Sequence, residues 1–492
     1  MSPIWKLTLD KIRRRESSYP APRLWDGNRL NRAVNQCGAE PDLPRILYLS
    51  FMSYAAAIEQ LNTMTPELYQ KAGQPRRKFS LDEIGVLLAE LGNPQHKFPA
   101  VLIAGTNGKG STAATLASIL SAAGVRTGLF TSPHLERANE RIRIDRMEIP
   151  DHDFARHFFH AHDAGQQLVL AGRLPQLPSY FEILTAQAFL YFAETGAQIA
   201  VLEVGMGGRL DATNVVDPLF SVVTDISLDH MEWLGPTISA ITSEKAGILR
   251  RNGTLITLPQ HPEANQVLGE VATELNVRGI NAARYMPGLG DGSDAYTVDA
   301  LGTQIEIDSP LKGAHQHRNL ALAIAAAVEL AERHRFPVTP AAIADGIRLT
   351  RWPGRLERVS SGAVDWILDV AHNPAGAWAL RAGLRTLLGE KSLGVLVFGC
   401  LRDKPVAEMA QILFPLFEQV ILAPIHSSRA AGIDELVAAA RSTGTKARAA
   451  GSVSEALNIA EELAAGSPVV VSGSVYLVGE ARSLLLPARQ EP

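Results

Sequence analysis

The segment Ala104-Gly105-Thr106-Asn107-Gly108-Lys109-Gly110-Ser111-Thr112 decides the fold of this chain. It follows an apolar run over residues 100–104 and precedes a helix-forming stretch over residues 113–123. A strand, a glycine-rich turn and a helix start bind phosphate, because glycines let backbone N–H groups turn inward, the helix N-terminus favours negative charge and a lysine reaches the outer phosphates. The spacing departs from G-x-x-x-x-G-K-[ST], since Gly110 stands between Lys109 and Ser111. We predict a nucleotide-binding loop here rather than a plain strand-to-helix turn.

Length and composition set the broad class. A chain of 492 residues is too long for one ordinary core, which predicts two domains. Hydrophobic residues at 46% and charged residues at 20% are typical of a soluble globular protein. A net charge of -4 without blocks of like charge gives no reason to expect a nucleic-acid partner. Two cysteines, Cys37 and Cys400, support neither a disulfide framework nor a cysteine metal site.

Targeting signals are not expected. No apolar run is long enough to cross a bilayer, and the basic N-terminus lacks the apolar region and the cleavage site of a signal peptide. We therefore expect a cytoplasmic protein without a membrane partner. Residues 1–48 lack sustained periodicity and are expected to form a disordered extension, with a basic binding arm as the alternative. Met52 is an alternative start, because organised sequence begins near Ser53.

Beyond the glycine-rich turn, short β-branched runs alternate with longer helical stretches, which predicts βαβ units and a mainly parallel sheet. A Gly-interrupted run over residues 296–307 predicts a small antiparallel addition. Strands are expected over residues 127–130, 199–204, 221–226 and 254–258, and helices from Ser53 and over residues 81–91, 181–194, 237–246 and 315–332.

A break at Leu349-Thr350-Arg351-Trp352-Pro353-Gly354-Arg355 separates this region from a second alternation of strands and helices. We place a nucleotide-binding domain over residues 49–348, a linker over 349–354 and a smaller Rossmann-like α/β domain over 355–492. Strands of the smaller domain are expected over residues 366–369, 394–398, 419–423 and 468–471.

Polar residues are predicted at the carboxyl edge of the first sheet, where ligands of open parallel sheets bind. They are Lys109, Glu203 at the end of an apolar strand, and His230 in the segment after residues 221–226. An ionised Glu203 on such a strand needs a cation or several donors, so we weigh Mg2+ beside phosphates against a salt bridge to Arg209 or another arginine. For His230, a structural and a functional role are equally open.

Further candidates follow other strands. The glycine-rich loop over residues 205–214 is expected to line a ligand cleft. Lys245, near the end of a short helix, is by itself typical of a solvated residue that complements the helix dipole. In the smaller domain, Asp369-Val370-Ala371-His372-Asn373-Pro374 ends a strand, and Pro374 is suited to open the next helix. A second substrate is therefore expected between the domains.

The motifs together resemble one family. Residues 105–111 are similar to the phosphate loop of the Mur-ligase superfamily, and Glu203-Val204-Gly205-Met206-Gly207-Gly208-Arg209-Leu210-Asp211-Ala212-Thr213-Asn214 resembles folylpolyglutamate synthase/dihydrofolate synthase. The resemblance runs from Ser53 to Ala481 in the family's order. It also includes Thr131-Ser132-Pro133-His134-Leu135, Glu244-Lys245-Ala246-Gly247-Ile248, Trp352-Pro353-Gly354-Arg355-Leu356-Glu357, Ala371-His372-Asn373-Pro374 and Gly473-Ser474-Val475-Tyr476-Leu477.

The resemblance implies an N-terminal P-loop-type ATPase domain, a C-terminal Rossmann-like glutamate-ligase domain and an ATP-dependent amide ligase, which we expect to be a monomer. The substrates would be ATP, L-glutamate and dihydropteroate or folate, with an acyl phosphate as intermediate. Lys109, Lys245 and His372 would be catalytic, and Lys245 would become a carbamate by reaction with CO2. Mg2+ would be held by Ser132, Glu203, His230 and Lys245.

Binding residues are also implied by the resemblance. ATP would contact Gly105, Thr106, Asn107, Gly108, Lys109, Gly110, Ser111, Thr112, Asn319, Arg355 and Asp369. The other substrates would contact Ser179, Tyr180, Phe181, Glu182, Leu210, Asp211, Ala212, His372 and Ser474.

One position departs from the family pattern, which often has glycine after the Asp of Asp-x-Ala-His-Asn-Pro where this chain has Val370. The geometry around Asp369 is therefore open. Two other functions compete with the folate ligase: a Mur-type ligase acting on a peptidoglycan precursor, and a nucleotide-binding protein that has lost catalysis.

Overall fold

The computed structural model describes residues 53–64, 80–288, 295–362, 364–389, 393–464 and 466–486. The chain divides into Met1–Ala56 and Ala57–Pro492, and the first unit is described only over residues 53–56, around the start of helix α4 (Tyr54–Thr63). The extension expected over residues 1–48, with Cys37, lies outside the described residues. In the described part of the chain, no helix combines the length and the apolar character that a membrane span requires.

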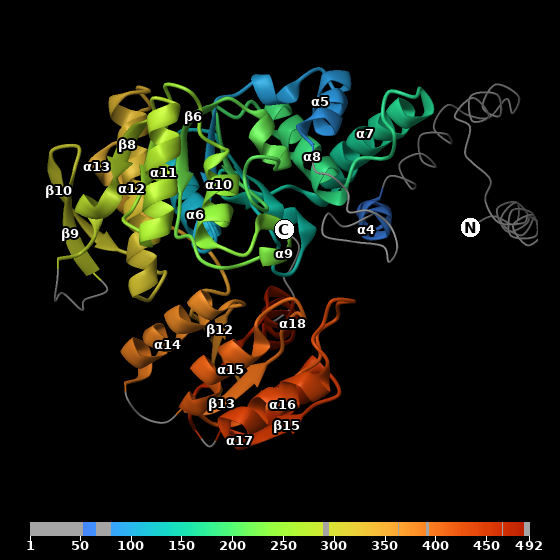
Figure 1. Ribbon diagram of the computed structural model, residues 1–492, viewed down its shortest axis with the longest axis vertical. Helices are drawn as coiled ribbons and strands as arrows, with labels where there is room; N and C mark the ends of the chain where they lie inside the picture. Colours follow the sequence, from blue (N-terminus) through green and yellow to red (C-terminus); the bar gives the residue numbers. More distant parts are fainter. Residues whose placement is uncertain are drawn as a thin grey trace, which may run out of the picture. The chain divides into compact units, whose positions relative to one another are not determined.

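The N-terminal domain runs to α13, and Figure 1 labels β6 and β8 among its strands. It is built on an eight-stranded sheet in the order β4-β3-β2-β5-β1-β6-β7-β8. In this order, every pairing from β2 through β5, β1, β6 and β7 to β8 is parallel. The pairings of β2 with β3 and of β3 with β4, at one edge, are antiparallel. The predicted mainly parallel sheet is therefore confirmed. The strands are β1 (Ala100–Ala104), β2 (Thr127–Phe130), β3 (Ile142–Ile144), β4 (Met147–Glu148), β5 (Ile199–Glu203), β6 (Pro218–Val223), β7 (Thr254–Thr257) and β8 (Arg278–Asn281).

Helices cover both faces of this sheet, as the burial of a parallel sheet requires. Val101 and Ile103 of β1 pack on one face into a core shared with α6, α12 and α13, whereas Phe189 and Phe192 of α8 pack together with Phe98. The helices are α5 (Leu81–Glu90), α6 (Lys109–Ala122), α7 (Asp151–Leu170), α8 (Tyr180–Glu194), α9 (Met231–Leu234), α10 (Ile238–Ala246), α11 (Pro262–Glu274), α12 (Ala314–Glu332) and α13 (Pro340–Arg348).

Helix α6 differs from the sequence prediction at its start. It begins at Lys109, with Gly108 as the N-cap, rather than at residue 113. Residues Gly110 to Leu120 are all buried, so the helix has no polar face. The early start places the free N–H groups of the first turn directly behind the glycine-rich loop.

A separate hairpin of β9 (Ala295–Ala300) and β10 (Thr303–Asp308) confirms the predicted antiparallel addition. Its two-residue turn, Leu301-Gly302, has positive φ at both positions. This conformation matches the right-handed twist of paired strands.

The C-terminal domain is a six-stranded sheet in the order β11-β12-β16-β13-β14-β15, with only β11 antiparallel to its neighbour. This confirms the predicted second α/β domain. Its elements are β11 (Glu357–Ser361), β12 (Val364–Asp369), α14 (Pro374–Leu388), β13 (Leu393–Phe398), α15 (Val406–Leu413), β14 (Phe417–Leu422), α16 (Ile433–Thr443), β15 (Ala447–Ala449), α17 (Val453–Leu463), β16 (Val469–Ser472) and α18 (Val475–Leu485).

The last helix, α18, contacts the connection between the domains. Arg482 donates from Nε to both carboxylate oxygens of Glu357 at 3.0 Å, and from Nη1 to Glu136 of the N-terminal domain. Glu357 in turn accepts from the N–H of Gly354 at 2.8 Å. One arginine therefore holds both the segment before β11 and a loop of the N-terminal domain.

The contact between α13 and α6 depends on Gly346, because a Cβ there would lie 2.3 Å from Cα of Ile119. The obstacle is backbone, so the Gly346→Ala change must push the helices apart. We expect it to lower the free energy of unfolding by about 1–3 kcal/mol, measured by urea denaturation. Gly269→Ala in α11, where nothing lies within 4 Å, is the control and should stabilise by about 0.4–1 kcal/mol. Equal behaviour of the two variants would contradict this packing.

Candidate active site

The glycine-rich loop between β1 and α6 approaches its neighbours too closely for any side chain. Gly105 has φ +151° and a Cβ there would lie 1.8 Å from Oγ1 of Thr224; Gly108 has φ +87° and a Cβ would lie 2.1 Å from Oδ1 of Asn319. Both the conformation and the space therefore require glycine.

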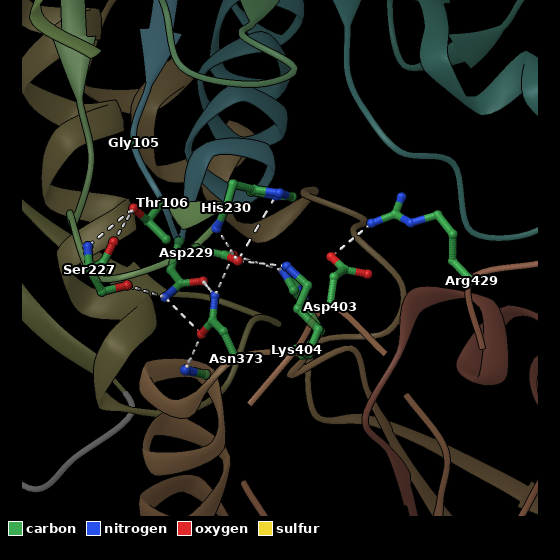
Figure 2. A network of polar contacts seen from close by, with 12 residues as sticks. Gly105, Thr106, Ser227, Asp229, His230, Asn373, Asp403, Lys404 and Arg429 are labelled. Carbon is green, nitrogen blue, oxygen red and sulfur yellow. Dashed lines mark hydrogen bonds and ion pairs between the residues drawn. The ribbon is translucent and has the colours of Figure 1, made fainter. Parts of the chain in front are cut away.

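Hydrogen bonds fix the same loop to the segment after β6. The N–H groups of Thr106 and Asn107 donate to the carbonyl of Asp225 at 2.8 and 3.2 Å. The Thr106 hydroxyl and Ser227 exchange two hydrogen bonds of 3.1 Å, as Figure 2 shows. Lys109 folds back, and its Nζ donates to the carbonyl of Thr106 at 3.1 Å. The result is a pre-formed cradle at the N-terminus of a buried helix, which is suited to phosphate.

The extra glycine of the motif, Gly110, is explained by Trp352. A Cβ at Gly110 would lie 2.8 Å from Cζ2 of Trp352, so the indole lies against the first turn of α6. The Arg143 guanidinium lies 5.4 Å from the ring centroid of the same indole. The sequence gives no sign of this contact, because the two residues are distant along the chain.

A cavity of about 490 Å³ opens beside the loop and is lined by both domains. Most of the predicted site residues meet there. The cavity is lined by Gly105, Thr106, Asn107, Gly108, Lys109, Gly110, Ser111, Ser132, Glu203, His230, Lys245, Asn319, Arg355, Asp369 and His372.

Glu203, at the end of β5, is 4% exposed. Its Oε2 accepts from the N–H of Ser132 at 3.0 Å, and within the described chain its other oxygen has no hydrogen-bond donor. Burial raises the pKa of Glu203, and the charge of Lys109 opposes this shift. Arg209 pairs instead with Glu244 at 2.8 Å, so the alternative of a Glu203–Arg209 salt bridge is wrong.

Lys245, at the end of α10, is 4% exposed, so a solvated surface role is also wrong. Its Nζ donates to the carbonyl of Gly105 at 2.6 Å. Burial, with the nearby charge of Lys109, lowers the pKa of Lys245 to about 7. A substantial fraction of the amine is therefore neutral at physiological pH.

Two histidines reach the cavity from opposite domains (His230 is labelled in Figure 2). Burial and the charge of Lys404 lower the pKa of His230 to about 3 and that of His372 to about 4, so both are neutral. Nδ1 of His372 lies 2.9 Å from the carbonyl of Val370, which can only accept. The proton is therefore on Nδ1, and Nε2 carries the free lone pair.

Asp369 ends β12 and is held by two backbone donors at 2.9 Å, the N–H groups of Leu356 and Ala371. Burial raises the pKa of Asp369 and lowers that of the neighbouring Arg355. Val370, where the family often has glycine, packs against Gly354, at which a Cβ would lie 2.9 Å from its Cγ1. The Val370 side chain is thus accommodated by its contact with Gly354 in the linker.

The remaining predicted residues do not line this cavity. Ser179 and Glu182 form a capping box at the start of α8, and the Asp211 carboxylate accepts from Met206 and Thr213. The Phe181 ring supports the cavity wall from behind, since a Cβ at Gly205 would lie 2.7 Å from it. The other predicted residues that do not line the cavity are Tyr180, Leu210, Ala212, Thr112 and Ser474. Contact of all these residues with a substrate or with ATP stays a prediction.

Some lining residues were not singled out from the sequence. Arg318 forks onto the Asp225 carboxylate at 2.6–2.9 Å, and Gln260 binds the backbone of Thr224 and Ile226. In the sequence, Arg318 is marked only by its position beside Asn319, and Gln260 only by its position shortly after a predicted strand.

The donor set at Ser132, Glu203 and His230 suits a divalent cation, because it offers a buried carboxylate with a spare oxygen, a hydroxyl and a neutral imidazole. Among the described residues, the one group whose histidine and carboxylate atoms all lie within 4.8 Å of one another is elsewhere: Asp153, His157 and Glu194. There the Arg156 guanidinium already bridges both carboxylates.

Comparison with known proteins identifies the family. The Mur ligase middle domain matches residues 103–327, and the Mur ligase glutamate ligase domain matches residues 354–475. Folylpolyglutamate synthase of Lacticaseibacillus casei is 34% identical over 443 residues, which span 88% of this chain and 99% of that relative. Dihydrofolate synthase/folylpolyglutamate synthase of Escherichia coli is 35% identical over 393 residues, 79% of this chain and 84% of the relative.

Solved structures agree. Mycobacterium tuberculosis folylpolyglutamate synthase complexed with ADP has a TM-score of 0.78 and 32% identity, over 89% of this chain and 100% of that one. The fold, the convergence of the motif residues on one cavity and these matches have a common explanation: the chain belongs to the folylpolyglutamate synthase/dihydrofolate synthase family of Mur ligases.

Proposed function

We propose that this protein is an ATP-dependent ligase that joins L-glutamate to dihydropteroate, to a folate, or to both, and releases ADP and phosphate. The observation that carries the proposal is the single cavity in which the phosphate loop, Glu203 and Lys245 face Asp369 and His372 of the C-terminal domain. Related structures support it, since E. coli FolC has been solved in complex with DHPP and ADP. That structure is 31% identical to this chain with a TM-score of 0.74, over 88% of this chain and 97% of the other.

The reaction would proceed in two steps. A carboxylate oxygen of the pteroyl substrate attacks the γ-phosphorus of ATP, an O–P bond forms, the bond to the β-phosphate oxygen breaks and ADP leaves. The glutamate amine then attacks the acyl carbon, loses a proton and expels phosphate. The protein contributes position and electrostatics: Lys109 and the N-terminus of α6 face the charge that gathers on the transferred phosphoryl group.

Mg2+ fits the donors on the N-terminal side of the cavity. Ser132, Glu203 and His230 would hold it, together with Lys245 as a carbamate, and the bound ion would neutralise phosphate charge. Carbamate formation needs a neutral amine, which attacks CO2 and releases a proton. The burial that lowers the pKa of Lys245 to about 7 supplies that amine.

The other substrate contacts follow the C-terminal domain. His372, which is neutral and lines the cavity, would meet the incoming glutamate, while Asn319, Arg355 and Asp369 would contact the nucleotide. We retain the domain boundaries inferred from the sequence, 49–348, 349–354 and 355–492, and propose a monomeric cytoplasmic enzyme.

The proposal predicts phosphate release when the protein is incubated with ATP, Mg2+, glutamate and either dihydropteroate or tetrahydrofolate. Comparing the two acceptors under identical conditions shows whether the first glutamate, later ones or both are added. Lys109→Ala should lower kcat by at least about 10²-fold, because one preorganised cation at the developing charge is lost.

No turnover with any pteroyl acceptor would defeat this proposal. Turnover with a UDP-linked peptidoglycan precursor would identify a Mur-type ligase. Tight ATP binding without product under every condition would identify a nucleotide-binding protein.

The carbamate role of Lys245 predicts a rescue. Lys245→Ala should lose most of kcat, and millimolar acetate or formate should restore part of it by supplying the missing carboxylate. The measurement is the initial rate of phosphate release against carboxylate concentration. Lys97→Ala, which removes an exposed lysine, is the matched control and should respond to neither change. Wild-type activity of Lys245→Ala would discard the carbamate.

A further inference from the structure

Four polar side chains form a chain of contacts across the two domains, which we call the interdomain relay: Asn107 and Asp229, which are partly buried, from the N-terminal domain, and Asn373 and Lys404, which are buried, from the C-terminal domain. Figure 2 shows Asp229, Asn373 and Lys404 facing one another. Asn107 and Asn373 exchange amide hydrogen bonds of 3.0 and 3.3 Å. Asp229 accepts from Asn373 at 3.0 Å and from Lys404 at 2.6 Å.

Asn373 is the centre of the relay and is 1% exposed. Its Oδ1 accepts from the N–H of Gly376 at 2.8 Å, as the N-cap of α14, and also from Asn107. Its Nδ2 donates to Asn107 and to Asp229. Both acceptor and both donor positions of the amide are therefore used. The Gly376 N–H can only donate, so it fixes which end of the amide faces the helix.

The charged half of the relay is equally enclosed. The side chains of Lys404 and Asp229 are 4% and 8% exposed. Removing one partner of such a pair leaves a buried charge unpaired, so the pair strongly favours this juxtaposition of the domains. Asp229 also receives the N–H of His230 at 2.9 Å, which ties the relay to the cavity wall.

Two directly bonded members of the relay, Asn107 and Asn373, lie in different ligand sites. Asn107 belongs to the phosphate loop, and Asn373 follows His372, where we place the incoming glutamate. A nucleotide bound at the phosphate loop would therefore act on the Asn107 amide and, through its Asn373 partner, on the start of α14.

We propose that Asn373 is a positioning residue that couples nucleotide binding at the phosphate loop to glutamate binding at the start of α14. The inference rests on the proposed function for the identity of the amino-acid substrate. By linkage, the coupling acts equally in both directions on binding affinities. Asn373 touches no reacting atom; it acts through Asn107 and Asp229.

Asn373→Ser separates this role from helix capping, because serine remains a good N-cap but is too short to replace the amide bridge. We expect kcat/KM for glutamate to fall by roughly 5- to 150-fold, the usual range of such couplings, while AMPPCP affinity changes little. The double variant Asn107→Ala/Asn373→Ser should lose less than the product of the two single losses, since both variants remove the contact that the two amides share. Arg429→Ala is the control, because its 2.8 Å pair with Asp403 stays within the C-terminal domain (Figure 2).

Hydrogen exchange with AMPPCP alone gives a readout that needs no turnover. AMPPCP should slow the exchange of amides over residues 374–377 in the wild type and in Arg429→Ala, but not in Asn373→Ser. The same protection in Asn373→Ser, wild-type kcat/KM for glutamate in that variant, or multiplicative losses in the double variant would each overturn the proposal. If the wild type shows the protection but turns over no pteroyl acceptor, the proposed function fails and the coupling stands.

Discussion

Two close backbone approaches, of Gly105 to Thr224 and of Gly108 to Asn319, constrain everything built around the cavity. They leave no room for a side chain at either glycine, because the Thr224 hydroxyl and the Asn319 amide already occupy that space. The alanine-rich, almost wholly buried α12 allows these approaches, and the segment after β6 then reaches the loop with its carbonyl groups. Core packing and phosphate binding thus both require Gly105 and Gly108.

The charges of the cavity show what the site is prepared to receive. Burial raises the pKa of Glu203 and of Asp369 and lowers that of Lys245 and of Arg355, so each group is pushed toward its neutral form. Asp229 behaves oppositely: burial acts to raise its pKa, but the charge of Lys404 and the hydrogen bond that Lys404 donates lower it overall. A desolvated group with a partner keeps its charge. The others face a cavity where a triphosphate and a cation would supply the missing partners.

Much of the fold could be predicted from local sequence, because apolar β-branched runs and capped helices are local signals. The strand ending at Glu203 and the loop around Lys109 were found this way. Helix α7 was not predicted, because its sequence is rich in histidine and contains Gly165, which weakens the helical pattern. In the fold, Pro178 packs against Gly165. Lys245 was misjudged from local pattern because its burial under Gly105 arises only when α10 packs beneath the loop. Contacts between distant segments, such as Gly110 with Trp352, have no local signal at all.

The contacts of Arg482 have a consequence for the order in which the protein folds. It lies in α18, the last element that the structure describes, yet it binds Glu136 of the N-terminal domain and Glu357 at the start of the smaller sheet. A nascent chain emerges from the ribosome beginning with its N-terminus, and domains fold in that order. The nucleotide cradle can therefore assemble before Arg482 is made, and the contacts of Arg482 with both domains are added once α18 has formed.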